Sequence, residues 1–141
     1  MWLLMITVGT TAFANNEETV SQQVLNNFKK EFVNAKDVNW ENSRDYVKAT
    51  FSLNEQVMFA YYTPAGELIA ITRNISSDKL PISLLTGLKK NYSEYWITDL
   101  FEAVTNGTGT YYITLQNADV EVILKSDEFG GWETFKKSKR S

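Results

Sequence analysis

Acidic side chains come closest to a catalytic set in this chain. Asp119 and Glu121 stand two residues apart in a strand-like segment, which places them on one face of the strand. Two carboxyl groups with separated pKa values are the arrangement that glycosidases use. These two acids also border a turn, where solvated acids are ordinary, and Asp99 and Glu102 have the spacing that points them to opposite faces. The carboxylates therefore do not predict an enzyme.

Metal and nucleophile chemistry has few suitable residues. The chain contains no histidine and no cysteine, which removes the commonest general base, thiol nucleophiles, disulfides and the usual ligands of zinc, copper or iron. A Ser-His-Asp triad is excluded for the same reason. Oxygen ligands for calcium gather at residues 117–121 and 126–128, but neither segment has the full loop of ligands that a calcium site needs. The sequence predicts a non-catalytic protein without a metal or cofactor.

Charge is distributed unevenly along the chain. The formal net charge is −3, and four of the 14 basic residues lie within residues 136–141, so the rest of the chain carries a net charge of −7. A nucleic-acid-binding surface needs the opposite balance, and nucleic acid is not expected as a partner. Residues 136–141 are predicted to be a frayed basic tail; contact of this tail with phosphates or lipid headgroups is the alternative.

Residues 1–14 have the pattern of a secretory signal peptide. They carry no charge and end in Ala-Phe-Ala, a small-x-small cleavage pattern, after which residues 15–18 are sharply polar. The apolar run is shorter than the ~18–20 residues of a membrane span, so no stable membrane insertion is expected once the leader is removed. The usual basic residue at the start of a leader is missing, which suggests a true start upstream. Export without cysteines favours a periplasmic or secreted location in a Gram-negative bacterium.

The same series of sequence features occurs twice along the chain. In each copy an amphipathic stretch with a Lys-Lys pair precedes strand-like segments and a glycine turn. The pair at 29–30 recurs at 89–90, an offset of 60 in the numbering, whereas Gly66 recurs as Gly130, an offset of 64. Such a repeat indicates one sheet that is assembled from two similar halves.

Apolar spacing predicts the elements of each half. Helices are expected at residues 17–35 and 81–92, where apolar residues recur every three to four positions. Period-two alternation and turn residues predict six strands, with a possible short seventh at 132–135. The six strands are expected at residues 45–53, 57–63, 67–74, 95–105, 110–116 and 120–125.

Short turns between successive strands require an antiparallel sheet, and two helices can cover only one of its faces. The predicted fold class is α+β: two tandem α-β-β-β repeats form one antiparallel sheet with two helices packed on one face. A single domain is expected over residues 15–135, with the repeats at about residues 17–75 and 76–135.

Several stretches resemble one family of periplasmic proteins. Residues 32–41, FVNAKDVNWE, match the F-x-x-A-x-x-V-x-W pattern at the end of the first helix in the PepSY-like, beta-lactamase-inhibitor-like (BLIP-like) family. The strand at 46–51, the turn at 62–67 and the Leu-Pro at 80–81 follow in the family's order, so the likeness covers residues 20–135. The resemblance implies a secreted, non-catalytic protein. The family takes its name from tandem-repeat proteins that clasp beta-lactamases with an open sheet face, but a shared fold does not transfer that target.

Aromatic residues are the candidates for partner binding. Tyr46, Tyr62, Trp96 and Tyr112 are placed on the polar side of their strands and form the predicted partner-binding surface. Tyr and Trp dominate binding hot spots because they bury much area at low entropic cost. The alternative is that these side chains pack the core or cover the sheet. Trp40, at the predicted helix-to-strand corner, is expected to be structural.

Two functions remain open from the sequence. The favoured one is a periplasmic binding module that recognises an unknown protein or peptide through the face of the sheet that the helices leave open. The alternative is a carrier for a small apolar or glycan ligand, held in a cavity between sheet and helices. That carrier would have a cavity lined by residues such as Phe51, Phe59 and Ile113.

Overall fold

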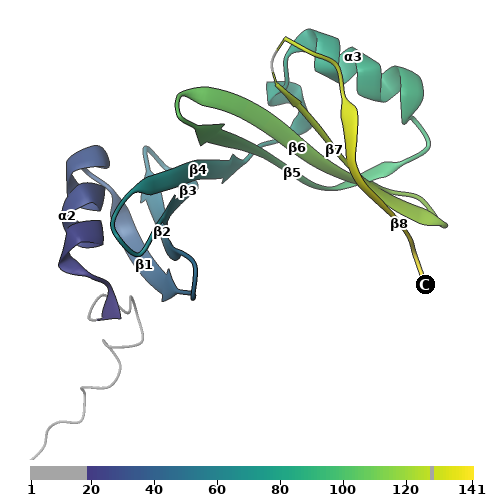
Figure 1. Cartoon of the computed structure of the whole chain (residues 1–141). Helices are drawn as coiled ribbons and strands as arrows, with labels where there is room; N and C mark the ends of the chain where they lie inside the picture. The colour runs from purple at the N-terminus through teal and green to yellow at the C-terminus, as the bar shows by residue number, and fades with distance from the viewer. Residues whose placement is uncertain (1–18, 128) are drawn as a thin grey trace, which may run out of the picture. The chain divides into compact units, whose positions relative to one another are not determined.

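The computed structural model describes residues 19–127 and 129–141 (Figure 1). The predicted leader, residues 1–14, lies outside the described residues. The chain divides into two compact units, unit 1 (Met1–Ile71) and unit 2 (Thr72–Ser141), and each is described by itself. Within the described part of the chain, no helix is long and apolar enough to cross a membrane.

Two helices and eight strands make up the described structure, and the sheet follows chain order from β1 to β8. Five ladders between successive strands of this sheet are antiparallel. The predicted α+β fold is confirmed, with eight strands in place of six or seven. The elements are α2 (Gln22–Glu31), β1 (Lys36–Asn42), β2 (Val47–Leu53), β3 (Gln56–Tyr62), β4 (Leu68–Asn74), a 3-10 turn η3 (Ser77–Lys79), α3 (Ile82–Asn91), β5 (Trp96–Thr105), β6 (Thr108–Gln116), β7 (Val120–Asp127) and β8 (Glu133–Lys139).

The first additional strand is β1, which lies between the predicted first helix at 17–35 and the predicted first strand at 45–53. Only Trp40 of its seven residues is buried, so the period-two signal of a strand is missing from its sequence. A bulge between Lys36 and Asn39, with Asp37 at a φ of 53°, interrupts the register further.

The second additional strand is β8, and it corrects the prediction of a frayed basic tail. Residues 133–139 pair with β7 from Lys125↔Glu133 to Val120↔Lys139. All seven side chains of β8 are exposed, so its sequence carries no apolar alternation. The backbone of β7 holds the strand in place, because an edge strand needs only one neighbour for its ladder.

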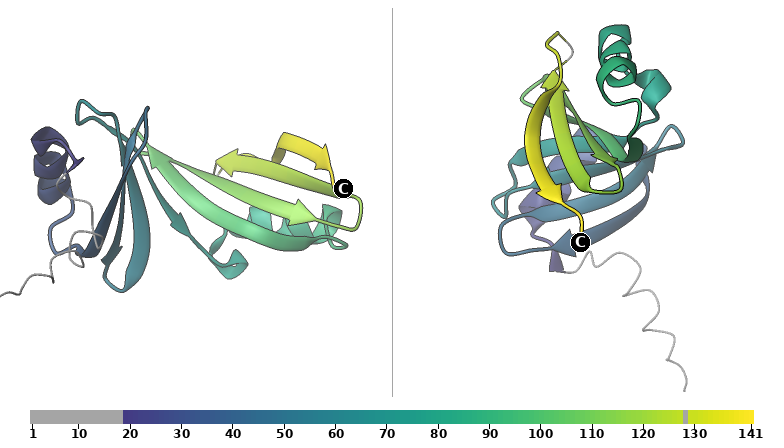
Figure 2. Two further views of the ribbon diagram at one scale, coloured as in Figure 1. Left: turned by 90° about the horizontal axis from the view of Figure 1, so that it is seen from below. Right: turned by 90° about the vertical axis from the view of Figure 1, so that its right-hand side faces the viewer.

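The core of unit 1 is aromatic, and α2 supplies one side of it. The Ser21 hydroxyl caps this helix by accepting from the Val24 N–H at 3.3 Å, so the helix begins later than residue 17. Phe28 of α2 packs edge-on against Trp40 at 5.1 Å and against Phe51 at 5.0 Å. Figure 2 shows α2 lying against the strands of its own unit.

Aliphatic residues fill the core of unit 2. Leu84 and Leu88 of α3 are buried with Ile113, Leu115 and other apolar residues of β5, β6 and β7. Pro81 stands at the N-cap of α3, one position before the predicted first turn. Each helix therefore covers the strands of its own unit with an apolar stripe.

The two offsets seen in the sequence have a structural origin. Trp40 and Leu100, at an offset of 60, are both buried, and they pair with Ala49 and Ile113, at an offset of 64. The extra length of the second copy therefore falls within the β5–β6 hairpin. Positions before that hairpin correspond at the smaller offset, and positions after it at the larger one.

Candidate functional site on the open sheet face

Strands β2 and β3 present one face to α2 and leave the other open. On β2 the buried residues Val47, Ala49 and Phe51 alternate with the half-buried Lys48 and Thr50. The open face of a unit is defined here by the strand positions that alternate with its buried core positions. The same alternation holds on β6, where Tyr111, Ile113 and Leu115 are buried.

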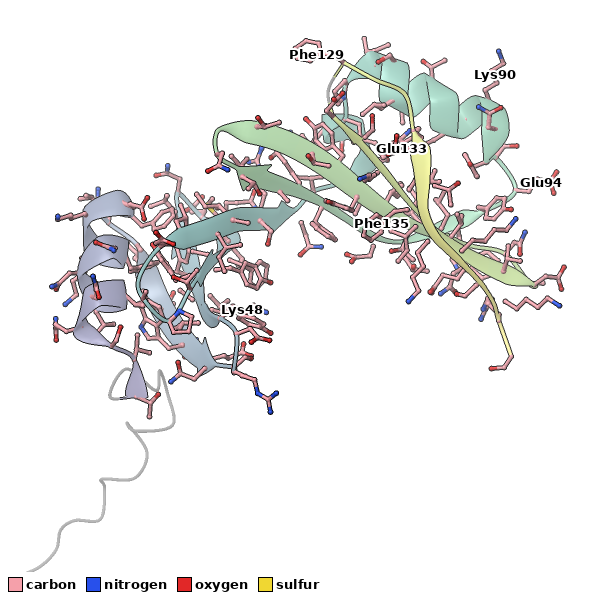
Figure 3. All side chains as sticks on the ribbon, viewed as in Figure 1. Lys48, Lys90, Glu94, Phe129, Glu133 and Phe135 are labelled. Carbon is pink, nitrogen blue, oxygen red and sulfur yellow. The ribbon has the colours of Figure 1, made fainter. Side chains whose placement is uncertain are left out.

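The open face of unit 1 carries a cluster of aromatic rings around one lysine. Lys48 is the cross-strand partner of Tyr61, and its ammonium lies 4.9 Å from the ring centre of Phe59 and 5.7 Å from that of Tyr61 (Figure 3). Tyr46 meets Tyr61 edge-on at 5.6 Å. Glu41 on β1 lies 4.0 Å from Lys48. We call these five residues the unit 1 cluster.

Unit 2 has a similar cluster on its own open face. The Tyr112 ring stacks on Phe101 at 5.2 Å, with 17° between the planes, and meets Phe135 edge-on at 5.6 Å. Lys125, the cross-strand partner of Tyr112, lies 5.5 Å from the Phe135 ring centre and 3.8 Å from Glu133 (Figure 3). We call these five residues the unit 2 cluster.

The two clusters contain the same cross-strand pair with its members exchanged. Lys48 and Tyr61 in unit 1 occupy the positions that Tyr112 and Lys125 occupy in unit 2, at the larger of the two offsets. In both units a lysine lies over an aromatic ring and beside a glutamate. Such a surface offers flat apolar area, a cation and phenol hydroxyls, which are groups common in binding surfaces.

Trp96 also lies on the open face of unit 2, at the far end of β5. Its side chain is 49% exposed, and the Arg140 guanidinium lies 5.6 Å from the ring centre. Its cross-strand partner Gln116 donates to a Glu121 carboxylate oxygen at 2.6 Å. Tyr46, Trp96 and Tyr112 thus lie on open faces, as the sequence predicts, and their role in binding stays a prediction.

Tyr62 is placed wrongly by the sequence prediction. It is fully buried in the core of unit 1, where its hydroxyl donates to the Glu31 carboxylate at 2.9 Å. Burial, together with this hydrogen bond, raises the pKa of the Tyr62 phenol well above its usual 10.0. Its cross-strand partner is the buried Val47, so Tyr61, its neighbour in the chain, is the tyrosine on the open face.

Six aromatic or basic members of the clusters were missed in the sequence: Lys48, Phe59, Tyr61, Phe101, Lys125 and Phe135. Phe59 and Phe101 lie in segments with apolar residues on both faces, so alternation alone does not assign them. Phe135 ends the possible last strand at 132–135, and because every side chain of the observed β8 is exposed, no alternation assigns Phe135 to a face. Lys48 alternates with apolar residues in the sequence, as a position on the open face should. Only its pairing with Tyr61 across the strands shows that it meets aromatic rings.

Trp40 is 2% exposed and contacts Phe28 in the core, which is the placement expected of a structural residue. The candidate carboxylates have polar partners of their own. Asp99 accepts from the Asn74 amide at 2.9 Å, and Glu102 pairs with Arg73 at 2.8 Å. In the described part of the chain, no three acidic residues come together as metal ligands.

The cavity expected for a small-ligand carrier does not form from the residues proposed for it. Phe51 is buried against Phe28 and Phe32, whereas Phe59 faces the opposite side of the sheet, beside Lys48. An apolar groove of about 330 Å³ does lie at the end of α2. Its lining comes from residues 25–40 and includes neither Phe51 nor Phe59. The predicted lining of the carrier is therefore wrong.

Comparisons with known proteins establish the fold. A BLIP-like protein from Bacteroides fragilis NCTC 9343 superposes with a TM-score of 0.73 and 18% identity, over 85% of this chain and 86% of the other. A DUF2874 family protein from Bacteroides ovatus ATCC 8483 gives 0.74 and 18%, over 85% and 87%. A Bacteroides eggerthii DSM 20697 protein described as periplasmic gives 0.74 and 14%, over 85% and 88%.

These three likenesses confirm the predicted BLIP-like fold. No protein-family model and no curated protein matches the chain.

Proposed function

We propose that this chain is an exported, non-catalytic binding module of the periplasm, which recognises a protein or peptide through the open face of its sheet. The observation that carries the proposal is the Lys–Tyr cross-strand pair with its aromatic neighbours, present in both units. Aromatic side chains held in place by stacking lose little entropy on binding, which favours them as anchors for a partner.

A periplasmic location is supported by two independent features. Residues 1–14 have the pattern of a signal peptide, and the structural neighbour from Bacteroides eggerthii is described as periplasmic. The absence of histidine and cysteine from the sequence favours binding over catalysis. Polar partners of the acidic residues, such as Arg73 for Glu102, favour a structural role for these carboxylates.

Affinity capture from a periplasmic extract tests the proposal. The wild-type chain is compared with a Tyr46→Ala/Tyr112→Ala variant, which removes one aromatic residue from each cluster. We expect at least one captured protein to be lost from the variant, because truncating a central aromatic anchor typically costs ~2 kcal/mol or more of binding free energy.

A matched control removes exposed apolar side chains that lie outside both open faces. Val33 follows α2 and is 65% exposed, and Ile82 lies on α3 and is 82% exposed. The Val33→Ala/Ile82→Ala variant should retain the partners of the wild type. Equal capture by all three proteins would show that the open faces do not bind the partner.

A further inference from the structure

Strand β8 ends the sheet and leaves one edge free. It pairs with β7 on one side, and among the described residues no strand pairs with its other side. All of its side chains are exposed. The backbone N–H and C=O groups along a free edge can pair with an additional strand.

The backbone groups of Lys137 and Lys139 point to this free edge. The Arg140 N–H donates to the Asp119 carbonyl of the preceding turn at 2.9 Å, and the register of β8 against β7 is unbroken from residue 136 to residue 139. Alternate residues of an antiparallel strand direct their backbone groups to opposite sides. Because Arg140 faces β7, the backbones of Lys137 and Lys139 face away from it.

The side chains along this edge are basic on both faces of the sheet. Lys136 pairs with Ile123, which alternates with buried Val122 and Leu124, so Lys136 lies on the open face. Lys137 pairs with Val122 and lies on the opposite face. An incoming strand therefore meets lysines whichever way its side chains alternate.

Charge complementarity selects the occupant. Opposite charges on directly facing residues stabilise a strand pair, and like charges destabilise it. A second copy of β8 would bring lysines against lysines, which disfavours pairing of this edge with itself. Lipid headgroups or nucleic acid would use the positive charge alone and leave the outward backbone groups of Lys137 and Lys139 without partners.

We propose that the free edge of β8 binds an extended acidic peptide segment, which adds to the sheet as a further strand. The backbone of the segment pairs with Lys137 and Lys139, and its Asp or Glu side chains face the basic residues of the edge. The unit 2 cluster includes Glu133 and Phe135 of the same strand. The proposed edge site uses the outward backbone groups of Lys137 and Lys139 instead, so it is tested by different variants from the open-face proposal.

Fluorescence anisotropy with the whole chain tests the proposal. The probe is a fluorescein-labelled peptide of alternating Glu and Thr. The control peptide has the same sequence and carries N-methyl groups on every second residue. Methylation keeps the charge and removes the hydrogen-bond donors that a strand needs. We expect the methylated peptide to bind about tenfold more weakly or worse, since it loses the ladder but not the charge.

Protein variants locate the site. Lys137→Glu/Lys139→Glu should weaken binding of the unmethylated peptide about tenfold or more by placing like charges opposite each other. The control Lys89→Glu/Lys90→Glu changes net charge equally on α3, from which Lys90 projects away from the strands (Figure 3), and should bind as the wild type does.

Three results would overturn the proposal: no binding of the acidic peptide, equal binding of the methylated peptide, or equal loss in the α3 control. The last two would show attraction by charge alone. Circular dichroism melts of each variant establish that it is folded, and the methylated peptide tests the ladder on the wild-type protein.

Discussion

The two units build one arrangement of helix and strands with different cores. Unit 1 places Phe28, Trp40 and Phe51 in ring contact, whereas the matching positions in unit 2 hold Leu88, Leu100 and Leu115. Rings pack with specific edge-on geometry, while leucines fill space with little directional preference. The comparison shows that the fold fixes which positions are buried and leaves the chemistry of the filling open.

A second difference lies where a turn meets the helix of each unit. In unit 1, Asn27 of α2 donates to the Gly66 carbonyl at 2.7 Å. Gly66 has a φ of 104°, which strains any residue with a side chain, and a Cβ there would lie 3.0 Å from the Gln23 side chain of α2. Gly87 occupies the position of Asn27 in α3. There the Trp132 ring lies next to the glycine and donates from its indole N–H to the Leu84 carbonyl at 2.9 Å.

Matching positions of the two units also carry side chains of different size in the core. Tyr62 fills the site in unit 1 that the smaller Ser126 fills in unit 2, and Leu68 corresponds to the larger Trp132. Unit 2 thus loses volume at Ser126 and Gly87 and regains it at Trp132. Interiors are packed to a nearly constant density, so we expect these volume changes to compensate one another.

The largest effect is expected from shortening equivalent core residues. Phe51→Ala should lower the free energy of unfolding by about 4 kcal/mol and Leu115→Ala by about 3 kcal/mol, because each leaves a cavity in a packed core. Both residues are almost fully buried, at 1% and 2% exposure. Urea unfolding of the two variants measures the difference. A cost below about 1 kcal/mol for either residue would contradict its core role.

Trp132→Ala is the next largest change, and it tests the compensation of volumes. The variant should lose about 3 kcal/mol of unfolding free energy, since a large ring and a hydrogen bond to α3 disappear together. Leu68→Ala, at the matching position of unit 1, should cost less because a leucine side chain is smaller and has no hydrogen bond to lose. Thermal melts compare the two.

Substitutions at Gly87 supply the control for this prediction. A Cβ at Gly87 would lie 3.5 Å from the Trp132 ring, an ordinary contact, so Gly87→Ala should be neutral or stabilise α3 by up to about 1 kcal/mol. Gly87→Asn, the residue of unit 1, should instead cost about 1–3 kcal/mol by overpacking against the ring. Equal stability of both variants would show that Trp132 does not depend on the glycine.

Much of the fold could be predicted from the sequence, because its main signals are periodic. Helix stripes, alternating inner strands and the offsets of 60 and 64 between landmarks all have direct structural counterparts. The edge strands β1 and β8 could not be predicted in this way. They bury one residue or none, so pairing with a neighbour determines them and no pattern in their own side chains does.

The site was predictable only in part for a related reason. Strand β3 is apolar on both faces, so nothing in its sequence corrected the choice of Tyr62 over Tyr61 as the exposed tyrosine. The register decides between them, and the hydrogen bond from the Thr63 N–H to the Glu67 carbonyl at 2.8 Å closes the following turn in that register. Information of this kind resides in the pairing of segments and not in either segment alone.

Alkaline pH should affect the stability of unit 1 through Tyr62. The pKa of its phenol is raised in the folded state, so between pH 10.0, its usual value, and the raised value the unfolded chain releases a proton that the folded chain retains. The contribution of Tyr62 to the free energy of unfolding is therefore complete below pH 10.0 and falls as the pH rises above it. Tyr62→Phe removes this loss together with the hydrogen bond to Glu31, which is worth about 1–2 kcal/mol.

The difference in unfolding free energy between wild type and Tyr62→Phe isolates the effect, because other groups titrate in both proteins. We expect the wild type to be more stable at neutral pH and the difference to shrink above pH 10.0. Unit 2 has Ser126 at this position, which does not titrate. Tyr46→Phe, an exposed change in the same unit, is the control, and a constant difference across the pH range would contradict the prediction.

The smallest effects are expected from the exchanged Lys–Tyr pairs. They test whether each lysine couples to its cross-strand partner or to the ring that its ammonium contacts. In unit 1 Lys48 lies over both Phe59 and Tyr61, whereas in unit 2 Lys125 lies over Phe135. Double-mutant cycles to alanine should give a coupling of about 0.5 kcal/mol for Lys48 with Phe59 and for Lys125 with Phe135.

The cycle for Lys125 with its cross-strand partner Tyr112 should give a smaller coupling than the one for Lys125 with Phe135. The Tyr112 ring packs between Phe101 and Phe135. Lys125 therefore lies over the Phe135 ring of the next strand, β8. If Lys125 couples more strongly to Tyr112, the cross-strand position alone determines the contact, and β8 adds nothing to the open face of unit 2 beyond an additional ring. If it couples more strongly to Phe135, the edge strand β8 completes the surface we propose for binding.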